Sequence, residues 1–156
     1  MKKAKTLFTL ALLLCVSATE VVAETGSQNV INKNNMTMSK MDEQMTAILK
    51  AVELYAEAGR KGSREIGEKA FTEKATMSWV EKGVITTVPI SALFEGLEQT
   101  GAEEVAYKVV DVSIAGDIAF VHIESFFSKL GTFDDMFTLA EQDGEWKIVS
   151  KIYHVK

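Results

Sequence analysis

The C-terminal third of the chain alternates between apolar and polar residues, as half-buried strands do. Between residues 104 and 156, β-branched and aromatic residues recur in four stretches of strand length. Turn-forming residues separate these stretches at 115–117, 128–131 and 143–144. The pattern predicts four consecutive antiparallel strands joined by hairpins, with one face that another part of the chain must cover.

The residues upstream have the periodicity of helices and can provide that cover. Over residues 42–59, apolar side chains recur every three or four positions and form one stripe. A second, short helix is expected over residues 63–70, and a third after Pro89. Short strands at 76–80 and 84–87 lie between these two helices. The predicted order is α-α-β-β-α-β-β-β-β, an α+β fold with helices on one face of an antiparallel sheet.

The first 23 residues have the three parts of a bacterial signal peptide. Three lysines precede an apolar core at residues 7–16, and small or apolar residues follow at 21–23. We expect cleavage after Ala23, which would place the protein in the periplasm or outside the cell. A retained membrane anchor is the alternative.

The remaining chain predicts a linker and one domain. Residues 24–41 are polar, without apolar periodicity, and are expected to form a flexible linker. Residues 42–156 suffice for one domain with a single core. The one cysteine, Cys15, lies in the signal peptide, so the mature chain would have no disulfide and no thiolate ligand. Cleavage removes three lysines and one glutamate and takes the net charge from −5 to −7. Nucleic acid and membrane surfaces are therefore not expected as partners.

Several local sequences resemble those of a known superfamily. Tyr55 lies on the first helix, residues 71–76 read FTEKAT, and residues 143–148 read DGEWKI downstream of the FDD sequence at 133–135. Their order and spacing resemble the nuclear transport factor 2-like (NTF2-like) superfamily, whose cystatin-like cone is shared with ketosteroid isomerase, scytalone dehydratase and polyketide cyclases. The C-terminal sequence is most similar to the secreted branch labelled putative lumazine-binding. The resemblance covers residues 42–156 and implies three helices packed on a strongly curved antiparallel sheet.

Turn lengths also predict which residues share a face of the sheet. With two-residue turns at 116–117 and 143–144 and a regular four-residue loop at 128–131, the expected pairs are Glu124 with Asp135, Phe126 with Phe133, His122 with Phe137 and Leu139 with Ile148. One face then gathers most of the aromatic residues with a few ionisable groups. We assign this face to the helix-covered side, because such a surface is typical of a small-ligand pocket. One extra residue in the 128–131 loop would reverse half of these assignments. The expected pocket residues are Tyr55, Trp79, Phe94, Tyr107, His122, Glu124, Phe126, Phe133, Asp135 and Phe137.

Three of these residues are weak candidates for catalysis. Glu124 beside Asp135 would form a carboxylate pair, which raises the pKa of one member and suits a general acid. His122, paired with Asp111, could act as an oriented base. Each candidate also has a structural interpretation without catalysis. The two carboxylates could lie partly solvated at the rim of the sheet, and His122 could have a purely structural role. A metal site built from His122, Glu124 and Asp135 depends on the same register, and we expect neither a metal nor a cofactor.

The resemblance to ketosteroid isomerase does not extend to its catalytic base. That enzyme uses a helix tyrosine in its oxyanion hole and an aspartate base on the first strand. The resemblance places Tyr55 at the first position and Trp79 at the second, and an indole cannot take a proton from a substrate carbon. The preferred interpretation is an exported, non-catalytic domain that binds a small apolar or aromatic molecule. An isomerase- or dehydratase-like enzyme using His122, Glu124 and Asp135 and a homodimeric interaction module with a collapsed pocket remain alternatives.

The opposite face of the sheet is aliphatic and also needs cover. A surface of this kind is rarely left in water, so a second subunit is expected to pack on it. The sequence predicts a homodimer through this outer sheet face, with Ile123, Met136, Val149 and Tyr153 at the interface.

Overall fold

The computed structural model describes residues 17–156, with side chains from residue 37 onward. By its contacts the chain divides into two units, residues 1–43 and 44–156. The described part of the first unit is helical and belongs to α1, Ser17–Lys61. The signal peptide predicted at residues 1–23 lies mostly outside the described residues, so its presence and cleavage remain predictions.

Helix α1 begins earlier than the apolar stripe indicates. Residues 24–41, predicted as a flexible linker, are helical, and the helix expected from Asp42 continues them. Extending an existing helix adds one hydrogen bond for each residue fixed, and residues 24–41 contain no proline that would stop it. Among the described residues, no helix is both long and apolar enough to cross a bilayer.

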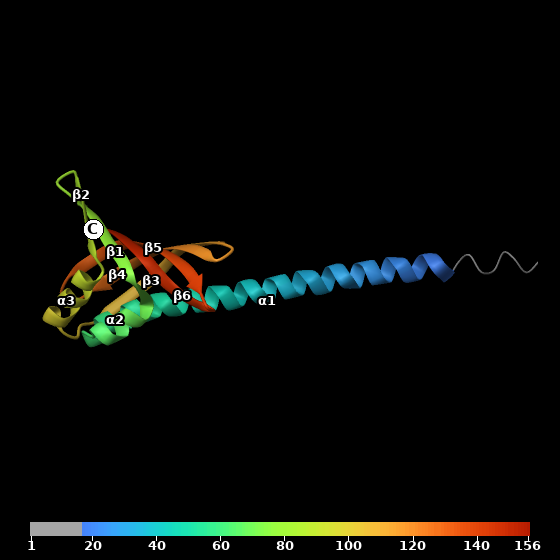
Figure 1. Cartoon of the computed structure of the whole chain (residues 1–156), viewed down its shortest axis with the longest axis horizontal. Helices are drawn as coiled ribbons and strands as arrows, with labels where there is room; N and C mark the ends of the chain where they lie inside the picture. The colour runs from blue at the N-terminus through green and yellow to red at the C-terminus, as the bar shows by residue number, and fades with distance from the viewer. Residues whose placement is uncertain (1–16) are drawn as a thin grey trace, which may run out of the picture. The chain divides into compact units, whose positions relative to one another are not determined.

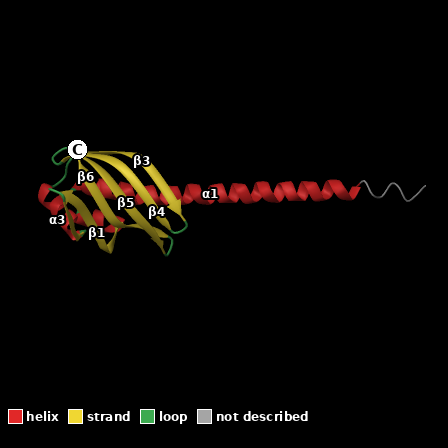
Figure 2. Ribbon diagram, turned by 90° about the horizontal axis from the view of Figure 1, so that it is seen from above, coloured by secondary structure: helices red, strands yellow, loops and turns green. Residues whose placement is uncertain are grey.

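The domain has the predicted order of elements and the predicted α+β architecture. The elements after α1 are α2 (Arg64–Ala70), β1 (Phe71–Glu81), β2 (Val84–Pro89), α3 (Ser91–Thr100), β3 (Val105–Ala115), β4 (Ile118–Phe127), β5 (Gly131–Gln142) and β6 (Glu145–Val155). The strands lie in the order β2-β1-β6-β5-β4-β3. The sheet, expected to be antiparallel, is mixed, because β1 and β6 are parallel while every other neighbouring pair is antiparallel. Figures 1 and 2 show α2, α3 and the C-terminal part of α1 on one side of the curved sheet.

The connection between α1 and α2 requires a glycine. Gly62 has a φ of +59°, which side chains rarely tolerate, and an added Cβ would lie 2.6 Å from the carbonyl carbon of Gly101. Ser63 then caps α2, its hydroxyl accepting a hydrogen bond from the Ile66 amide at 3.4 Å. This close approach holds the start of α2 against the end of α3.

The concave side of the sheet and the apolar stripe of α1 form one core. Ile48 and Val52 on α1 are fully buried, as predicted from the stripe. Facing them, the centre of the sheet contributes side chains that are also fully buried, among them Val121, Phe137 and Leu139. Burying each such side chain contributes about 1.5–3 kcal/mol, so this layer holds the sheet to the helices.

The connection between β4 and β5 is shorter than predicted, and this changes the register. Gly131 pairs with Phe127, which leaves three loop residues instead of four. Glu124 therefore pairs with Asp134, and Asp135 pairs with Ile123. The predicted pairings of Glu124 with Asp135, of Phe126 with Phe133 and of His122 with Phe137 are wrong by one residue. Because side chains alternate along a strand, this slip reverses the faces assigned to β4.

Two bulges cause further differences. The first bulge lies in β6, where this strand pairs with β5. Leu139 of β5 pairs with Ile148 of β6 as predicted, but the preceding Thr138 pairs with Ser150, so Val149 is an extra residue in β6. Lys151 consequently lies opposite Phe137 on the concave face. In β3, a second irregularity follows Val109, and the predicted pairing of Asp111 with His122 is confirmed.

The outer face of the sheet carries a different set of residues from the one predicted. Ile123 is completely buried in the core and Tyr153 faces the concave side, so neither lies at an outer interface. Met136 is exposed on the outer face, as predicted, and Val149 is half-buried at the bulge. The outer face is still apolar: its exposed side chains include Val110, Phe120, Phe126, Met136 and Ile152.

Candidate functional site

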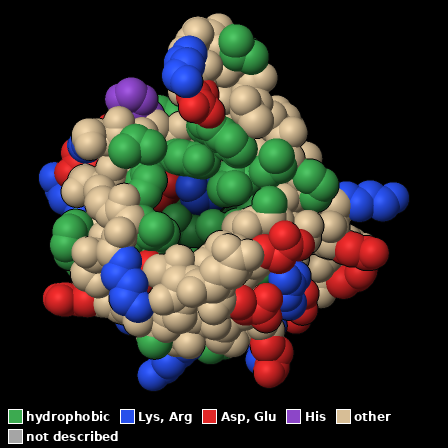
Figure 3. All heavy atoms as spheres, turned by 90° about the vertical axis from the view of Figure 1, so that its left-hand side faces the viewer, with side chains coloured by type: hydrophobic (Ala, Val, Ile, Leu, Met, Phe, Trp, Pro, Cys, Tyr) green, Lys and Arg blue, Asp and Glu red, His purple; other side chains and the backbone are tan. Residues whose placement is uncertain are grey.

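A cavity of about 290 Å³ opens between α3 and the concave side of the sheet. Figure 3 shows hydrophobic side chains around a hollow with a basic side chain at its base. Among the residues that line the cavity, Lys151 is the one with a formal charge. The lining consists of Tyr55, Met77, Ala92, Leu93, Gly96, Leu97, Thr100, Phe127, Leu130, Phe133, Lys151 and Tyr153.

Lys151 is held by a buried carboxylate behind it. Its Nζ donates to Asp135 Oδ1 at 2.5 Å, and the two side chains are only 4% and 0% exposed. The other carboxylate oxygen accepts hydrogen bonds from the Tyr55 hydroxyl at 3.2 Å and from the Ser125 hydroxyl at 2.5 Å. A buried ion pair is tolerated when further hydrogen bonds satisfy its remaining atoms, and α1, β4 and β6 each supply one donor here.

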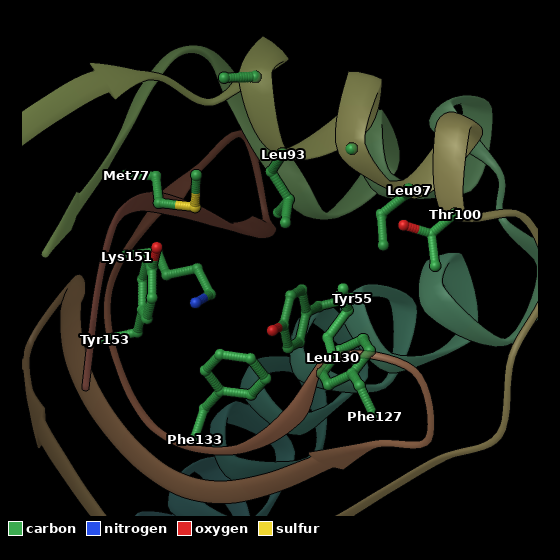
Figure 4. Close-up of a pocket in the computed structure, with 12 residues that line it drawn as sticks. Tyr55, Met77, Leu93, Leu97, Thr100, Phe127, Leu130, Phe133, Lys151 and Tyr153 are labelled. Carbon is green, nitrogen blue, oxygen red and sulfur yellow. The ribbon is translucent and has the colours of Figure 1, made fainter. Parts of the chain in front are cut away.

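The ammonium of Lys151 also lies against two aromatic rings. Its Nζ is 4.2 Å from the centroid of Tyr153 and 5.7 Å from that of Tyr55. Burial lowers the pKa of Lys151, and the negative charge of Asp135 opposes that shift. The bond to Asp135 uses one of three N–H donors. Figure 4 shows the amine of Lys151 and the hydroxyl of Tyr55 both directed toward the cavity.

Tyr55 fixes the base of the cavity from the helix side. Burial, with Asp135 beside the hydroxyl, raises the pKa of Tyr55 well above its usual value, so the hydroxyl stays a neutral donor. Its ring packs edge-on against Phe137, with centroids 5.2 Å apart. The ring also lies 5.9 Å from that of Phe127, which lines the cavity. These contacts leave Tyr55 little freedom to rotate away from Asp135.

The aromatic wall extends from the base to the first strand. Tyr153 meets Phe133 edge-on at 5.8 Å and stacks on Trp79 at 5.7 Å with a 30° interplanar angle. Trp79 is opposite Tyr153 in the parallel pair of β1 and β6. Trp79 therefore supports the wall from behind, where the isomerase comparison would place a base.

The structure brings together some of the predicted pocket residues. Tyr55 and Phe133 line the cavity. Asp135 lies directly behind Lys151, and Phe137 is fully buried under Tyr55.

Two other predicted pocket residues lie elsewhere in the domain. Phe94 is buried where α3 meets α2 and the start of β1: its ring lies against Gly67, and its centroid is 5.8 Å from that of Phe71. Tyr107 lies on β3, and its hydroxyl donates to Glu53 at 2.8 Å. Neither side chain lines the cavity.

The three weak catalytic candidates are not brought together. His122 and Glu124 alternate with the buried residues of β4 and lie on the outer face, as does Phe126, whereas Asp135 faces inward. His122 Nε2 lies 3.2 Å from Asp134 Oδ1, and Glu124 bonds Lys156 at 3.0 Å. The carboxylate pair of Glu124 with Asp135, and the metal site that would share it, are therefore not formed.

Sequence reasoning missed Lys151, the residue that gives the cavity its polarity. Strict alternation along β6 places Lys151 on the outer face with Lys147, and only the extra residue at Val149 turns it inward. The available signal was Asp135, because a carboxylate on an apolar face requires a buried counter-charge. Leu93 and Leu97 of α3 line the cavity but were not among the residues expected in the pocket.

Comparisons with known proteins place the chain in a family. The family described as "Putative lumazine-binding" matches residues 43–154. An NTF2-like protein of unknown function from Shewanella baltica is 30% identical, with a TM-score of 0.67, covering 71% of this chain and 92% of that one. One from Silicibacter pomeroyi is 29% identical, with a TM-score of 0.67 and coverages of 74% and 98%.

A cystatin-like domain of unknown function from Nostoc punctiforme is 17% identical, with a TM-score of 0.59 and coverages of 72% and 76%, and it shows the fold alone. No curated protein matches the chain. The predicted superfamily and fold are confirmed: the chain belongs to the family described as "Putative lumazine-binding", within the NTF2-like proteins.

Proposed function

We propose that the domain binds a small, flat, largely apolar molecule that presents a hydrogen-bond acceptor to Lys151. One observation carries the proposal: a single buried ammonium lies at the base of an otherwise apolar cavity. Asp135 takes one N–H of Lys151, which leaves donors for a carbonyl or carboxylate oxygen of the ligand. A hydrogen bond to a charged group contributes about 1.5–3 kcal/mol, which gives the ligand a fixed orientation.

The shape of the cavity supports an aromatic or heteroaromatic ligand. Phe133 and Tyr153 present ring surfaces beside the amine, and Leu93 and Leu97 close the opposite wall. The family description refers to lumazine, a planar bicyclic molecule with ring carbonyls. Such a ring can stack on an aromatic wall while an oxygen meets Lys151.

Binding fits the site better than the proton abstraction of an isomerase. Among the described residues that line the cavity, there is no carboxylate and no histidine. Asp135 has no exposed surface and already accepts three hydrogen bonds, from Lys151, Tyr55 and Ser125. A base must reach the proton that it removes, and this carboxylate lies behind the amine.

Isothermal titration calorimetry tests the proposal with 2-naphthoate, 2-acetonaphthone, lumazine and naphthalene. We expect the three molecules with acceptors to bind more tightly than naphthalene, and Lys151→Met to remove that difference. Lys108→Met is the control, because Lys108 is exposed on β3 and does not line the cavity. The role of the amine would be contradicted if the wild type, like Lys151→Met, bound all four molecules with equal affinity.

We also propose that the protein acts outside the cytoplasm, on the support of its first 23 residues. The full chain, expressed in a bacterium, is expected in the periplasm or medium with Glu24 as its first residue. N-terminal sequencing of the fractionated protein checks this. An intact N-terminus in the cytoplasmic fraction would contradict it.

A homodimer through the outer sheet face is the last part of the proposal. Its support is the row of exposed apolar side chains on that face, including Phe120, Met136 and Ile152. The interface differs from the one expected from sequence, because Ile123 and Tyr153 face inward.

A further inference from the structure

The amine of Lys151 is both a hydrogen-bond donor and a nucleophile enclosed in an apolar cavity. We propose that Lys151 forms a reversible covalent iminium, a protonated Schiff base, with aromatic aldehydes and ketones that enter the cavity. This inference rests on the proposed function, because the cavity must first admit a small aromatic molecule. It goes beyond that function by assigning a reaction and a chemical class of reactant.

The geometry leaves one side of the amine open to a carbonyl carbon. Asp135 contacts Nζ from the protein side, at 2.5 Å, and the amine points into the cavity on the other side (Figure 4). The side chain is only 4% exposed, so a reactant reaches Nζ through the cavity. Enclosure of this kind holds the carbonyl against the amine and raises its effective concentration.

Asp135 can take and return the proton that the reaction requires. The proton of the ammonium passes to Asp135 Oδ1, while Tyr55 and Ser125 continue to donate to Oδ2. The neutral amine attacks the carbonyl carbon, a C–N bond forms, and a proton passes from nitrogen to the carbonyl oxygen, which gives the hydroxyl of a carbinolamine. Asp135 then returns its proton to Nζ, with which it is in contact, and the proton passes from there to the hydroxyl. The C–O bond breaks, water leaves, and the iminium remains. The net reaction converts an ammonium and a carbonyl compound into an iminium and water, with no change in charge.

Charge conservation makes carbonyl compounds the matching class of reactant. The iminium nitrogen remains positive, so Asp135 keeps a buried counter-ion at the same place. Acylation of the amine would remove the charge and leave Asp135 buried without one, which is strongly unfavourable. The lowered pKa of Lys151 also favours attack on a carbonyl carbon, because a larger fraction of this amine is neutral, and therefore nucleophilic, than for a surface lysine. The volume of about 290 Å³ suits a reactant of about one or two aromatic rings.

Reductive trapping tests the inference on the purified full-length protein. The protein is incubated with 2-naphthaldehyde and sodium cyanoborohydride, and the adduct is located by intact mass and peptide mapping. We expect a first adduct on Lys151, formed at least about 10-fold faster than on the average surface lysine. Excess 2-naphthoate, which cannot form an imine, should slow this labelling by occupying the cavity. Lys108→Met should be labelled as the wild type is.

The outcomes separate this inference from the proposed function. Adducts spread over many lysines, or a Lys151 rate no faster than that of Lys108, would overturn the covalent inference. If 2-naphthoate nevertheless binds to the wild type and not to Lys151→Met, the proposed function stands alone. If no probe binds and none is trapped, both fail. Peptide mapping of the wild type gives the answer even where Lys151→Met is unstable, and the Lys151→Met/Asp135→Asn variant provides a second negative control.

Discussion

Replacing Lys151 with methionine tests the charge balance at the base of the cavity. Methionine keeps an unbranched apolar chain but removes the ammonium. Asp135 then stays buried with only the hydroxyls of Tyr55 and Ser125 as donors. Breaking a buried ion pair from one side costs about 3–5 kcal/mol, because an uncompensated charge remains. We expect the free energy of unfolding of Lys151→Met to fall by this amount.

Removing the second charge should reverse much of that loss. In Lys151→Met/Asp135→Asn, the side-chain oxygen of Asn still accepts hydrogen bonds from Tyr55 and Ser125, and no charge is buried. We expect the double variant to regain about 2 kcal/mol relative to Lys151→Met. The interaction energy between the two positions follows from the cycle that includes Asp135→Asn alone.

Urea unfolding followed by tryptophan fluorescence measures all four proteins. Trp79 stacks on Tyr153 and Trp146 is buried, so both indoles report loss of the fold. A loss below about 1 kcal/mol, with no recovery in the double variant, would refute the assignment of a tightly coupled pair.

Three further predictions concern the remaining features of the domain. The pKa of each of the three tyrosines is raised by burial, that of Tyr107 to about 12, and Tyr55 and Tyr153 also lie near Asp135. An ultraviolet titration should therefore show little tyrosinate at pH 10, and half-ionisation at that pH would contradict the prediction. The stability that the neutral phenols provide should be lost as the pH rises above 10. Gly96 lies within α3 with open space at its Cβ, so Gly96→Ala should stabilise the fold by about 0.5–1 kcal/mol, whereas Gly96→Leu should fill the cavity and weaken binding of 2-naphthoate; unchanged calorimetry for Gly96→Leu would count against the site. Met136→Lys should give a folded monomer in light scattering, and a persistent dimer would remove the outer face as its interface.

The architecture could be predicted from the sequence because turns and periodicity are local signals. Asp143 and Gly144 both adopt positive φ, as a tight hairpin between β5 and β6 requires, and the pairing of Leu139 with Ile148 next to that turn was predicted correctly. The stripe of α1 likewise follows from spacing alone. Local chemistry therefore determines the order of elements and the register close to the two-residue turns.

The composition of the site could not be predicted, because it depends on one-residue events. The loop between β4 and β5 is one residue shorter than assumed, which moved His122 and Glu124 to the outer face. The bulge at Val149 moved Lys151 to the inner face. Neither change alters the composition or the hydrophobic content of the chain. Each reverses the face of the sheet on which the side chains of a whole stretch of strand lie.

The bulge in β6 has a consequence for variants that differ in length. A one-residue deletion in a central strand normally reverses the faces of everything beyond it. Here Ser150 already pairs with Thr138 and Lys151 with Phe137, so Val149 has no partner of its own. Deleting Val149 would join Ile148 to Ser150 in regular alternation and keep Lys151 inside, whereas a strand that paired Val149 with Thr138 would turn Ser150 and Ile152 inward. Deletion of Val149 would therefore preserve the cavity. A β6 that kept Val149 but lost the bulge would turn Lys151 outward and destroy the cavity.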